Sequence, residues 1–286
     1  MTSKQEPAIR RAFADLAHGQ MHYRTAGAGT PLLTLHSSPG SSKQLSYLIR
    51  ELAGIARVIS PDTPGNGDSD PLPLESPRIV DLAEAMVRFL DAMQIDKIDL
   101  YGSHTGGAIA AELAILAPDR IRRVVIDGVM VLTPEMRAAV LARYALPFPA
   151  DLDGAYLIRV FQFCRDQYLF YPWYDRTRKG QRSGSLPAPR DLHNWVVEVL
   201  KANESYHLNY QASFRWEAPA RLPLLAHPTL LLAAENDPLV ESTRDVASVV
   251  PGGRYVALPR TDAPDFSKRR LSVIGEFLAQ GRRSCD

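Results

Sequence analysis

Short apolar runs rich in Leu, Ile and Val recur along this 286-residue chain, and longer segments separate them. The intervening segments 81–93 and 107–116 have the apolar pattern of helices. This alternation is typical of β-α-β units, in which helical crossovers join parallel strands. Two further runs, 14–16 and 21–23, flank a His-Gly pair and predict an antiparallel hairpin at the sheet edge. The six apolar runs are residues 32–35, 58–59, 98–101, 124–126, 229–232 and 255–258.

The alternation stops near Leu132 and resumes near Pro223. The roughly 90 residues between these points are too many for a loop. Because the strand pattern then returns as though uninterrupted, we interpret the segment as an insertion between two strands. The sequence therefore predicts an α/β core formed by residues 1–132 and 221–286, with a helical cap formed by residues 133–220.

Aromatic residues are concentrated in one part of the predicted cap. Burial between cap and core is the favoured interpretation, because dense aromatic side chains are usually buried. An apolar substrate wall is compatible with it, since ligand pockets are mostly apolar and often lie at domain interfaces. We take Phe163, Tyr168, Tyr171 and Trp173 as candidate substrate-binding residues. The whole group is Phe161, Phe163, Tyr168, Phe170, Tyr171, Trp173 and Tyr174.

Residues 176–185, which follow the aromatic group, are basic and contain several small polar residues, a composition that predicts a flexible segment. A solvated loop is the favoured interpretation, because a few charges on a flexible segment bind little unless they are ordered. An anion-binding lid over a pocket is the alternative.

Charge and cysteine content exclude several classes of protein. The 33 Lys and Arg residues are balanced by 32 Asp and Glu, so the chain offers no basic footprint for nucleic acid or a membrane surface. Cys164 and Cys285 are too far apart for a Cys-x-x-Cys site and too few for a disulfide framework. We find no apolar span and no signal segment. We expect a cytoplasmic protein with a small-molecule substrate and no nucleic-acid or membrane partner; a homodimer is left open.

The most specific local motif is a predicted strand that runs directly into a predicted helix, Ile-Asp-Leu-Tyr-Gly-Ser-His-Thr-Gly-Gly. Gly102 and Gly106 lie two residues either side of His104, which is the Gly-x-Nuc-x-Gly spacing of a nucleophile elbow. Small residues at both positions let the chain bend sharply, so that the central side chain stands exposed above the sheet. Ser103 is out of register, because Tyr101 would occupy its upstream small position. We therefore assign His104 to the centre.

Three further segments carry recognisable motifs in the order expected of one family. Residues 35–41 read Leu-His-Ser-Ser-Pro-Gly-Ser, residues 61–69 read Pro-Asp-Thr-Pro-Gly-Asn-Gly-Asp-Ser, and residues 231–240 read Leu-Leu-Ala-Ala-Glu-Asn-Asp-Pro-Leu-Val. Together with the elbow they resemble the α/β-hydrolase superfamily over nearly the whole chain. The resemblance implies an α/β-hydrolase fold, a mostly parallel twisted sheet flanked by helices, here with an inserted cap.

The resemblance also implies roles for individual residues. Ser38 matches the position whose backbone N–H enters the oxyanion hole, and the N–H of Thr105, directly after the elbow residue, is the second donor. Asp237 matches the acid of the catalytic triad. We take His36 and Ser37, which precede Ser38 in the same loop, as candidate substrate-binding residues.

Two positions depart from the Ser-Asp-His triad of the family. His104 stands where Ser is usual, and Asp262 stands in the late loop where the triad His is expected. On this alignment a serine acyl-enzyme is excluded. Among the other histidines, His193 and His207 in the predicted cap are those that could reach the pocket, although surface and packing roles are commoner for histidine.

The two substitutions are complementary, because an imidazole and a carboxylate now occupy positions that normally touch. We expect Asp262 and Asp237 to support His104 as a general base, since a carboxylate fixes the tautomer of an imidazole and raises its basicity. The alternative is a nucleophilic His104 that forms an acyl-imidazole. Asp127, at the end of a predicted strand, could orient His104 instead, although capping the following turn is its commoner role.

These residues favour a cofactor-free hydrolase acting on a small, largely apolar ester or carbonyl compound. A lyase or isomerase with the same base and oxyanion hole is one alternative, and a catalytically silent ligand-binding member is another. Epoxide hydrolases and haloalkane dehalogenases resemble the capped architecture but use Asp at the elbow. A metal site formed by His104, Asp237 and Asp262 is disfavoured, because none of the usual ligand spacings occurs.

Overall fold

An eight-stranded sheet runs through residues 7–280, the part of the chain that the computed structural model describes. The strand order is β1-β2-β4-β3-β5-β6-β7-β8. The β1 and β2 strands form an antiparallel hairpin, β2 pairs antiparallel with β4, and every later pair in the order is parallel. The strands are β1 (Arg10–Leu16), β2 (Gly19–Ala26), β3 (Pro31–Leu35), β4 (Arg57–Pro61), β5 (Ile98–Ser103), β6 (Ile121–Asp127), β7 (Thr229–Ala234) and β8 (Arg254–Leu258).

The sequence pattern predicted these elements closely. Each of the six apolar runs lies in one of the strands β3 to β8, and the predicted hairpin is β1 and β2. The two predicted crossover helices are α2 (Ile79–Ala92) and α3 (Thr105–Leu116). The predicted fold class, a mostly parallel sheet flanked by helices, is confirmed.

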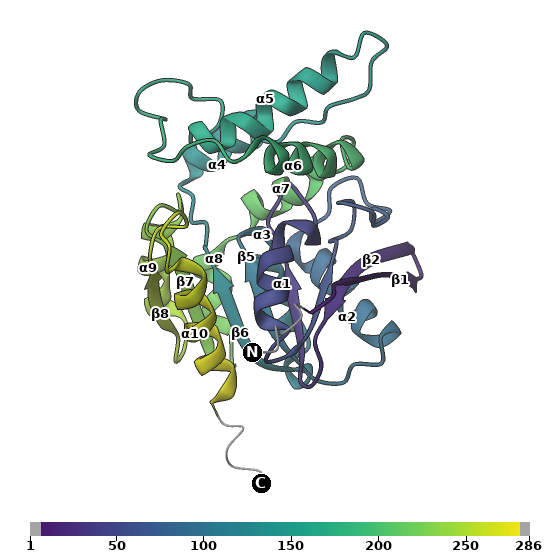
Figure 1. Cartoon of the computed structure of the whole chain (residues 1–286), viewed down its shortest axis with the longest axis vertical. Coiled ribbons are helices and arrows are strands. Elements are labelled where there is room, and N and C mark those ends of the chain that lie inside the picture. The colour runs from purple at the N-terminus through teal and green to yellow at the C-terminus, as the bar shows by residue number, and fades with distance from the viewer. Residues whose placement is uncertain (1–6, 281–286) are drawn as a thin grey trace, which may run out of the picture.

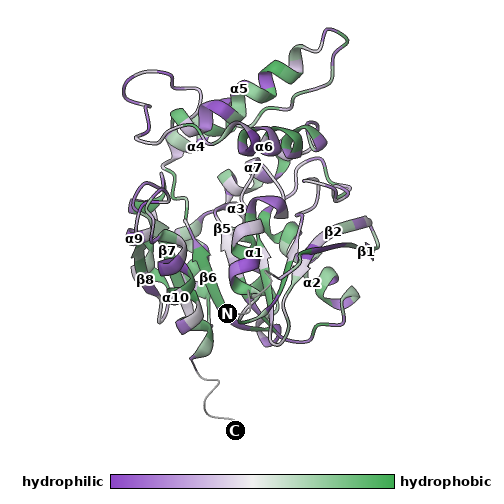
Figure 2. Ribbon diagram, in the orientation of Figure 1, coloured by the Kyte–Doolittle hydropathy of each residue, from purple (hydrophilic) through white to green (hydrophobic). Residues whose placement is uncertain are grey.

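Helices cover both faces of the sheet (Figure 1). The α1 helix (Ser46–Leu52) and the α10 helix (Phe266–Ala279) pack on one face, and α2, α3 and α9 (Val240–Val246) pack on the other. Because it is covered on both sides, β7 is buried along its whole length and reads as an apolar run. Figure 2 shows hydrophobic residues concentrated on the central strands.

The chain between β6 and β7 forms a layer of helices beyond one end of the sheet (Figure 1). This layer has its own aromatic core. The ring of Phe163 lies 5.2 Å from that of Trp173 and 5.4 Å from that of Phe148, which stacks on Tyr206 at 5.5 Å. The aromatic group therefore packs largely within this layer. The helices of the layer are α4 (Pro134–Arg143), α5 (Ala155–Leu169), α6 (Pro189–Lys201) and α7 (Tyr206–Arg215), and the short α8 (Ala218–Arg221) that follows them packs on the core beside α3.

Four short 3₁₀ helices complete the described chain, and none of its helices is long and apolar enough to cross a membrane. Cys164 is a buried free thiol, whereas Cys285 and the first six residues lie outside the described range. The 3₁₀ helices are η1 (Ser42–Leu45), η2 (Pro118–Arg120), η3 (Leu222–Leu224) and η4 (Ala247–Val249).

Candidate active site

His104 occupies the sharp turn between β5 and α3, with φ of 49° and ψ of −109°. A non-glycine residue in this region of backbone space is strained, and such strain clusters at functional sites. The flanking glycines let the turn close, because a Cβ atom on Gly102 would overlap the backbone of Gly106, and one on Gly106 would overlap the backbone of Leu35. The structure therefore has the elbow geometry that the Gly-bracketed motif predicted.

The imidazole of His104 is hydrogen-bonded to the carboxylate of Asp237, with 2.8 Å between Nε2 and Oδ2. Asp237 follows β7, and its other oxygen accepts the backbone N–H of Leu239 at 2.7 Å. Burial alone would raise the pKa of Asp237, but His104 and the Leu239 N–H outweigh it and hold the pKa below its usual value. An ionised carboxylate only accepts hydrogen bonds, so Nε2 of His104 must carry the proton.

The Asp237 carboxylate also sets the basicity of the ring. Burial of the imidazole alone would lower the pKa of His104, but the charge and hydrogen bond of Asp237 raise it above its ordinary value. With the proton on Nε2, the lone pair of the neutral ring lies on Nδ1. Within residues 7–280, Nδ1 has no hydrogen-bond partner.

Asp127 lies close to His104 but is bound elsewhere. Its backbone oxygen accepts the N–H of His104 at 2.9 Å, while its carboxylate accepts the hydroxyl of Tyr101 at 2.6 Å. Burial is the main reason why the pKa of Asp127 is raised, and the nearby charge of Asp237 adds to it. Asp127 therefore supports the backbone of the elbow, and the imidazole is oriented by Asp237.

Asp262 is not brought to His104. Its side chain is 60 % exposed, and both of its oxygens accept from the guanidinium of Arg260, at 3.0 and 2.9 Å. The sequence suggested that Asp262 pairs with His104, and this prediction is wrong. Asp262 instead forms an exposed ion pair with Arg260, two residues before it. Because a histidine side chain is longer than the serine usual at this position, His104 contacts Asp237 directly, and no histidine from the late loop lies between them.

Ser38 and Thr105 both line the cavity beside His104. Thr105 is the first residue of α3, where a backbone N–H has no acceptor within the helix. Ser38 is 8 % exposed, and its hydroxyl is buried without a hydrogen-bond partner among the described residues. The two predicted oxyanion donors therefore lie in the same cavity as the elbow imidazole.

His36 and Ser37 differ in their surroundings. Ser37 lines the cavity, as expected. His36 is buried and does not line it: its Nδ1 lies 2.8 Å from the carbonyl oxygen of Ser37, and its Nε2 accepts the N–H of Thr63 at 2.9 Å. His36 thus anchors the loop to the core, and its predicted contact with substrate is corrected.

A cavity of about 700 Å³ lies between the core and the helices above it. This volume is typical of a small-molecule site. Tyr168 and Tyr171 line it as predicted, whereas Phe163 and Trp173 do not, because both pack inside the helical layer. The sequence did not indicate the other aromatic lining residues, since they are spread over helices α1, α6 and α7 and the α4–α5 connection: Tyr47, Tyr144, Trp195, Tyr210 and Phe214.

Arg182 also lines the cavity, although it belongs to the basic segment that was expected to be a solvated loop. Its guanidinium donates to the carbonyl oxygens of Gln167 in α5 at 2.7 Å and of Asn236 in the loop after β7 at 3.4 Å. These two contacts order the side chain. Arg182 is therefore ordered at the cavity, unlike a side chain of a solvated loop. The predicted cap histidines, His193 and His207, are not among the residues lining the cavity.

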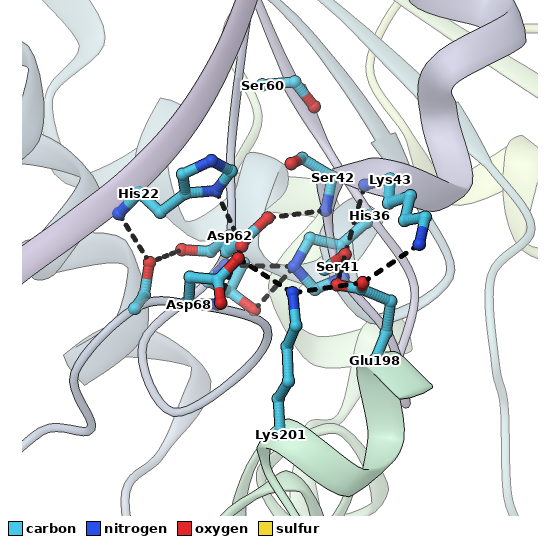
Figure 3. Close-up of polar contacts among 12 residues, drawn as sticks. His22, His36, Ser41, Ser42, Lys43, Ser60, Asp62, Asp68, Glu198 and Lys201 are labelled. Atoms are coloured by element: carbon cyan, nitrogen blue, oxygen red, sulfur yellow. Dashed lines mark hydrogen bonds and ion pairs between the residues drawn. The ribbon is translucent and has the colours of Figure 1, made fainter. Parts of the chain in front are cut away.

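One group of residues has ligand types and separations suited to a metal ion, namely His22, Asp62 and Asp68 (Figure 3). Asp62 is saturated by hydrogen bonds, however. It accepts from the N–H of Ser42 at 2.8 Å, from the N–H of Asp68 at 3.0 Å, and its Oδ2 lies 2.9 Å from Nδ1 of His22. A cation would have to displace these contacts, so we assign the cluster a role in holding the loops together.

Comparison with known proteins agrees with this architecture. The family described as alpha/beta hydrolase fold matches residues 30–262. The 2-hydroxymuconate semialdehyde hydrolase of Pseudomonas sp. (strain CF600) is 42 % identical over 282 residues, which cover 89 % of each chain. The 2-hydroxy-6-oxo-6-phenylhexa-2,4-dienoate hydrolase of Burkholderia cepacia is 26 % identical over 286 residues, which cover 93 % of each chain.

Solved structures share the fold at low sequence identity. An epoxide hydrolase from an endophytic Streptomyces superposes with a TM-score of 0.75 at 17 % identity, covering 98 % of both chains. The enol-lactonase from Burkholderia xenovorans LB400 superposes with a TM-score of 0.70 at 20 % identity, covering 94 % of this chain and all of the other. At such identities the likeness concerns the fold alone.

Proposed function

This chain belongs to the α/β-hydrolase fold family, and we propose that it hydrolyses a small, largely apolar ester or carbonyl compound with a His104–Asp237 pair in place of a serine nucleophile. Its relatives in the family are hydrolases, and the chain is an α/β-fold hydrolase. The observation that carries the proposal is the hydrogen bond between Nε2 of His104 and Asp237. It leaves the lone pair on Nδ1.

In the proposed reaction, His104 is a general base. Nδ1 takes a proton from a water molecule, the hydroxide attacks the carbonyl carbon of the substrate, and the imidazolium then returns the proton to the leaving group. Asp237 stabilises the imidazolium, because its ionised carboxylate already accepts the Nε2 proton. No cofactor is required for these steps.

Negative charge develops on the carbonyl oxygen as the hydroxide attacks. We assign its stabilisation to the backbone N–H groups of Ser38 and Thr105, which line the same cavity as His104. The positive end of the α3 helix, at Thr105, adds to this stabilisation. The same base and donors would also serve proton abstraction beside a carbonyl group, as in a lyase or isomerase. Analysis of the products therefore distinguishes these activities from hydrolysis.

The substrate class follows from two groups that line the cavity, the imidazole of His104 and the guanidinium of Arg182. The relatives named above act on an unsaturated semialdehyde and on an oxo acid. Such a compound carries a carbonyl group on which His104 can act, and an acid carries in addition a carboxylate that the guanidinium of Arg182 can pair with. The aromatic residues that line the cavity, among them Tyr144 and Tyr168, suit the unsaturated carbon chain of such a compound.

The test compares the wild type with His104→Ala and Asp237→Asn on 4-nitrophenyl acetate and on 2-hydroxymuconate semialdehyde, in water enriched in ¹⁸O. We expect the wild type to place ¹⁸O in the carboxylate product, and His104→Ala to lose at least about 100-fold in kcat/KM. Equal turnover by wild type and His104→Ala would overturn the mechanism. Products without ¹⁸O would identify a lyase or isomerase, and an acyl adduct in the intact mass would identify His104 as a nucleophile.

A further inference from the structure

The loop that carries Ser38 is fixed to the core at both of its ends. On the N-terminal side, the buried ring of His36 contacts the carbonyl oxygen of Ser37 and accepts the N–H of Thr63. On the C-terminal side, the N–H of Ser42 donates to Asp62 at 2.8 Å. Between these anchors the side-chain amide of Gln44 donates to the carbonyl oxygen of Pro39 at 2.9 Å.

The middle of the loop is also held by the cap helix α6. The indole N–H of Trp195 donates to the carbonyl oxygen of Pro39 at 2.7 Å, and the hydroxyl of Ser41 donates to Oε2 of Glu198 at 2.6 Å. Trp195 and Glu198 are three residues apart, so they lie on one face of α6. Their two contacts fall on either side of Gly40, within three residues of Ser38.

The Glu198 carboxylate is built into a chain of alternating charges (Figure 3). It is 3 % exposed, and its Oε1 lies 3.4 Å from the ammonium of Lys43 and 3.2 Å from that of Lys201, which in turn binds Asp68 at 2.9 Å. A buried carboxylate is costly unless it is paired in this way. Although Glu198 lines the cavity, both of its oxygens are occupied by protein groups.

We propose that Glu198 is a positioning residue, which holds the backbone N–H of Ser38 where the oxyanion forms, so that the cap completes the oxyanion hole of the core. The proposal rests on the proposed function. Glu198 acts through Ser41, because a shift of Ser41 moves the short segment that connects it to Ser38. Since the oxyanion carries its charge only during the reaction, losing this support lowers kcat and leaves KM nearly unchanged.

The kinetic test uses matched variants of the full chain on 4-nitrophenyl acetate. We expect Glu198→Ala to lower kcat by about 10- to 100-fold, part of the loss that removing a whole oxyanion donor causes. Glu198→Gln keeps an oxygen that accepts the Ser41 hydroxyl, so its kcat should be close to that of the wild type. Ser41→Ala breaks the same bond from the other side, and combining it with Glu198→Ala should add little.

Lys201→Met is the control, because it breaks the ion pairs of Lys201 with Glu198 and Asp68 and leaves the Ser41 contact intact. We expect its kcat to stay within about twofold of the wild type, as for most surface substitutions. An equal loss of kcat in Lys201→Met and Glu198→Ala would show that the ion pairs merely clamp the cap, and would overturn the proposal.

A binding measurement separates this proposal from the proposed function. The probes are 4-nitrophenyl methylphosphonate, a tetrahedral anion, and 4-nitroacetanilide, a planar neutral carbonyl compound, each titrated by calorimetry. We expect Glu198→Ala and Ser41→Ala to lose about tenfold in affinity for the phosphonate and none for the anilide. A wild type with no preference for the phosphonate would contradict the oxyanion hole itself. A preference that both variants retain would contradict only the role of Glu198.

Discussion

The imidazole of His104 lies against the backbone of Gly128, in the space that any side chain at position 128 would fill. A Cβ atom on Gly128 would come within 2.7 Å of Nε2 and closer still to the neighbouring ring carbon. Gly128 directly follows β6, and its N–H donates to the carbonyl oxygen of Leu232 in β7 at 2.9 Å. Three neighbouring strands thus define the position of the ring. His104 follows β5, Gly128 after β6 has no side chain to overlap the ring, and Asp237 lies in the loop after β7.

We therefore expect Gly128→Ala to displace the imidazole from Asp237 and to lower kcat/KM by about 100-fold, because small misplacements of a catalytic group are this costly. Because the backbone φ of Gly128 is 84°, a conformation that alanine adopts poorly, the substitution should also lower the free energy of unfolding by about 1 kcal/mol. Gly29→Ala is the matched control: its φ is 92° and no atom lies within 4 Å of the added Cβ. Urea unfolding should show the φ penalty in both variants and a larger loss in Gly128→Ala, whose added Cβ also overlaps His104, while only Gly128→Ala should lose kcat/KM. A normal kcat/KM in Gly128→Ala would contradict the expectation.

Asp237→Asn should change the pH dependence of the reaction in a defined direction. In the proposed mechanism His104 is a base only when it is neutral, so kcat/KM of the wild type should rise with pH through a pKa that Asp237 holds above its ordinary value. Without that charge, burial dominates, and the rising limb moves to lower pH. The plateau also falls by about 100-fold or more, because the tautomer is no longer fixed.

The pH–rate profile of Asp262→Asn is the control for Asp237→Asn. Asp262 is exposed and bound by Arg260, so we expect both its rising limb and its plateau to match the wild type. A displaced limb in Asp262→Asn, together with an unchanged limb in Asp237→Asn, would show that the late loop closes on His104 during turnover and would reverse the assignment of the two carboxylates.

Arg182→Met tests the proposed pairing of Arg182 with a substrate carboxylate. We expect KM for 2-hydroxy-6-oxo-6-phenylhexa-2,4-dienoate to rise by roughly 10- to 100-fold, the value of a charge-assisted hydrogen bond, while KM for 4-nitrophenyl acetate stays unchanged. The rising limb of the pH profile should move to higher pH, because the charge of Arg182 lowers the pKa of His104. Arg178→Met, an exposed residue of the same segment, should alter neither quantity; equal effects would point to the overall charge of the segment.

The sequence pattern predicted the sheet because hydrophobic burial acts locally on each strand. The run in β7 is apolar at every position after Thr229, since both faces of the strand are covered, and this is visible without knowing which strands are its neighbours. The elbow was equally visible, because Gly102 and Gly106 are required by close backbone contacts at fixed spacing.

The partners of His104 were harder to predict. Asp127, Asp237 and Asp262 all follow strands, so the sequence offered three carboxylates for one imidazole. The choice depends on competing side chains: Tyr101 binds Asp127, and Arg260 binds Asp262. Arg182 was missed for a related reason, because its order depends on carbonyl groups of Gln167 and Asn236, which lie far from it in the sequence.

Asp62 should contribute stability that disappears in acid. Burial raises its pKa, but His22 and the N–H donors around it outweigh burial and lower the pKa from 3.8 to about 2. A depressed carboxyl pKa contributes stability above the unfolded value, which is lost as pH falls through the folded value. The shift corresponds to about 2 kcal/mol in the free energy of unfolding, lost between about pH 4 and pH 2.

Urea unfolding of the wild type and Asp62→Asn at pH 5 and pH 2 measures this contribution. The wild type should be the more stable at pH 5, and its advantage should shrink by about 2 kcal/mol at pH 2. Asp119→Asn is the control, because Asp119 is exposed and has no ion pair or hydrogen bond in the described structure, so its difference from the wild type should not change with pH. An advantage of the wild type that is equal at both pH values would mean that the hydrogen bonds of Asp62 stabilise the loops without depending on its charge.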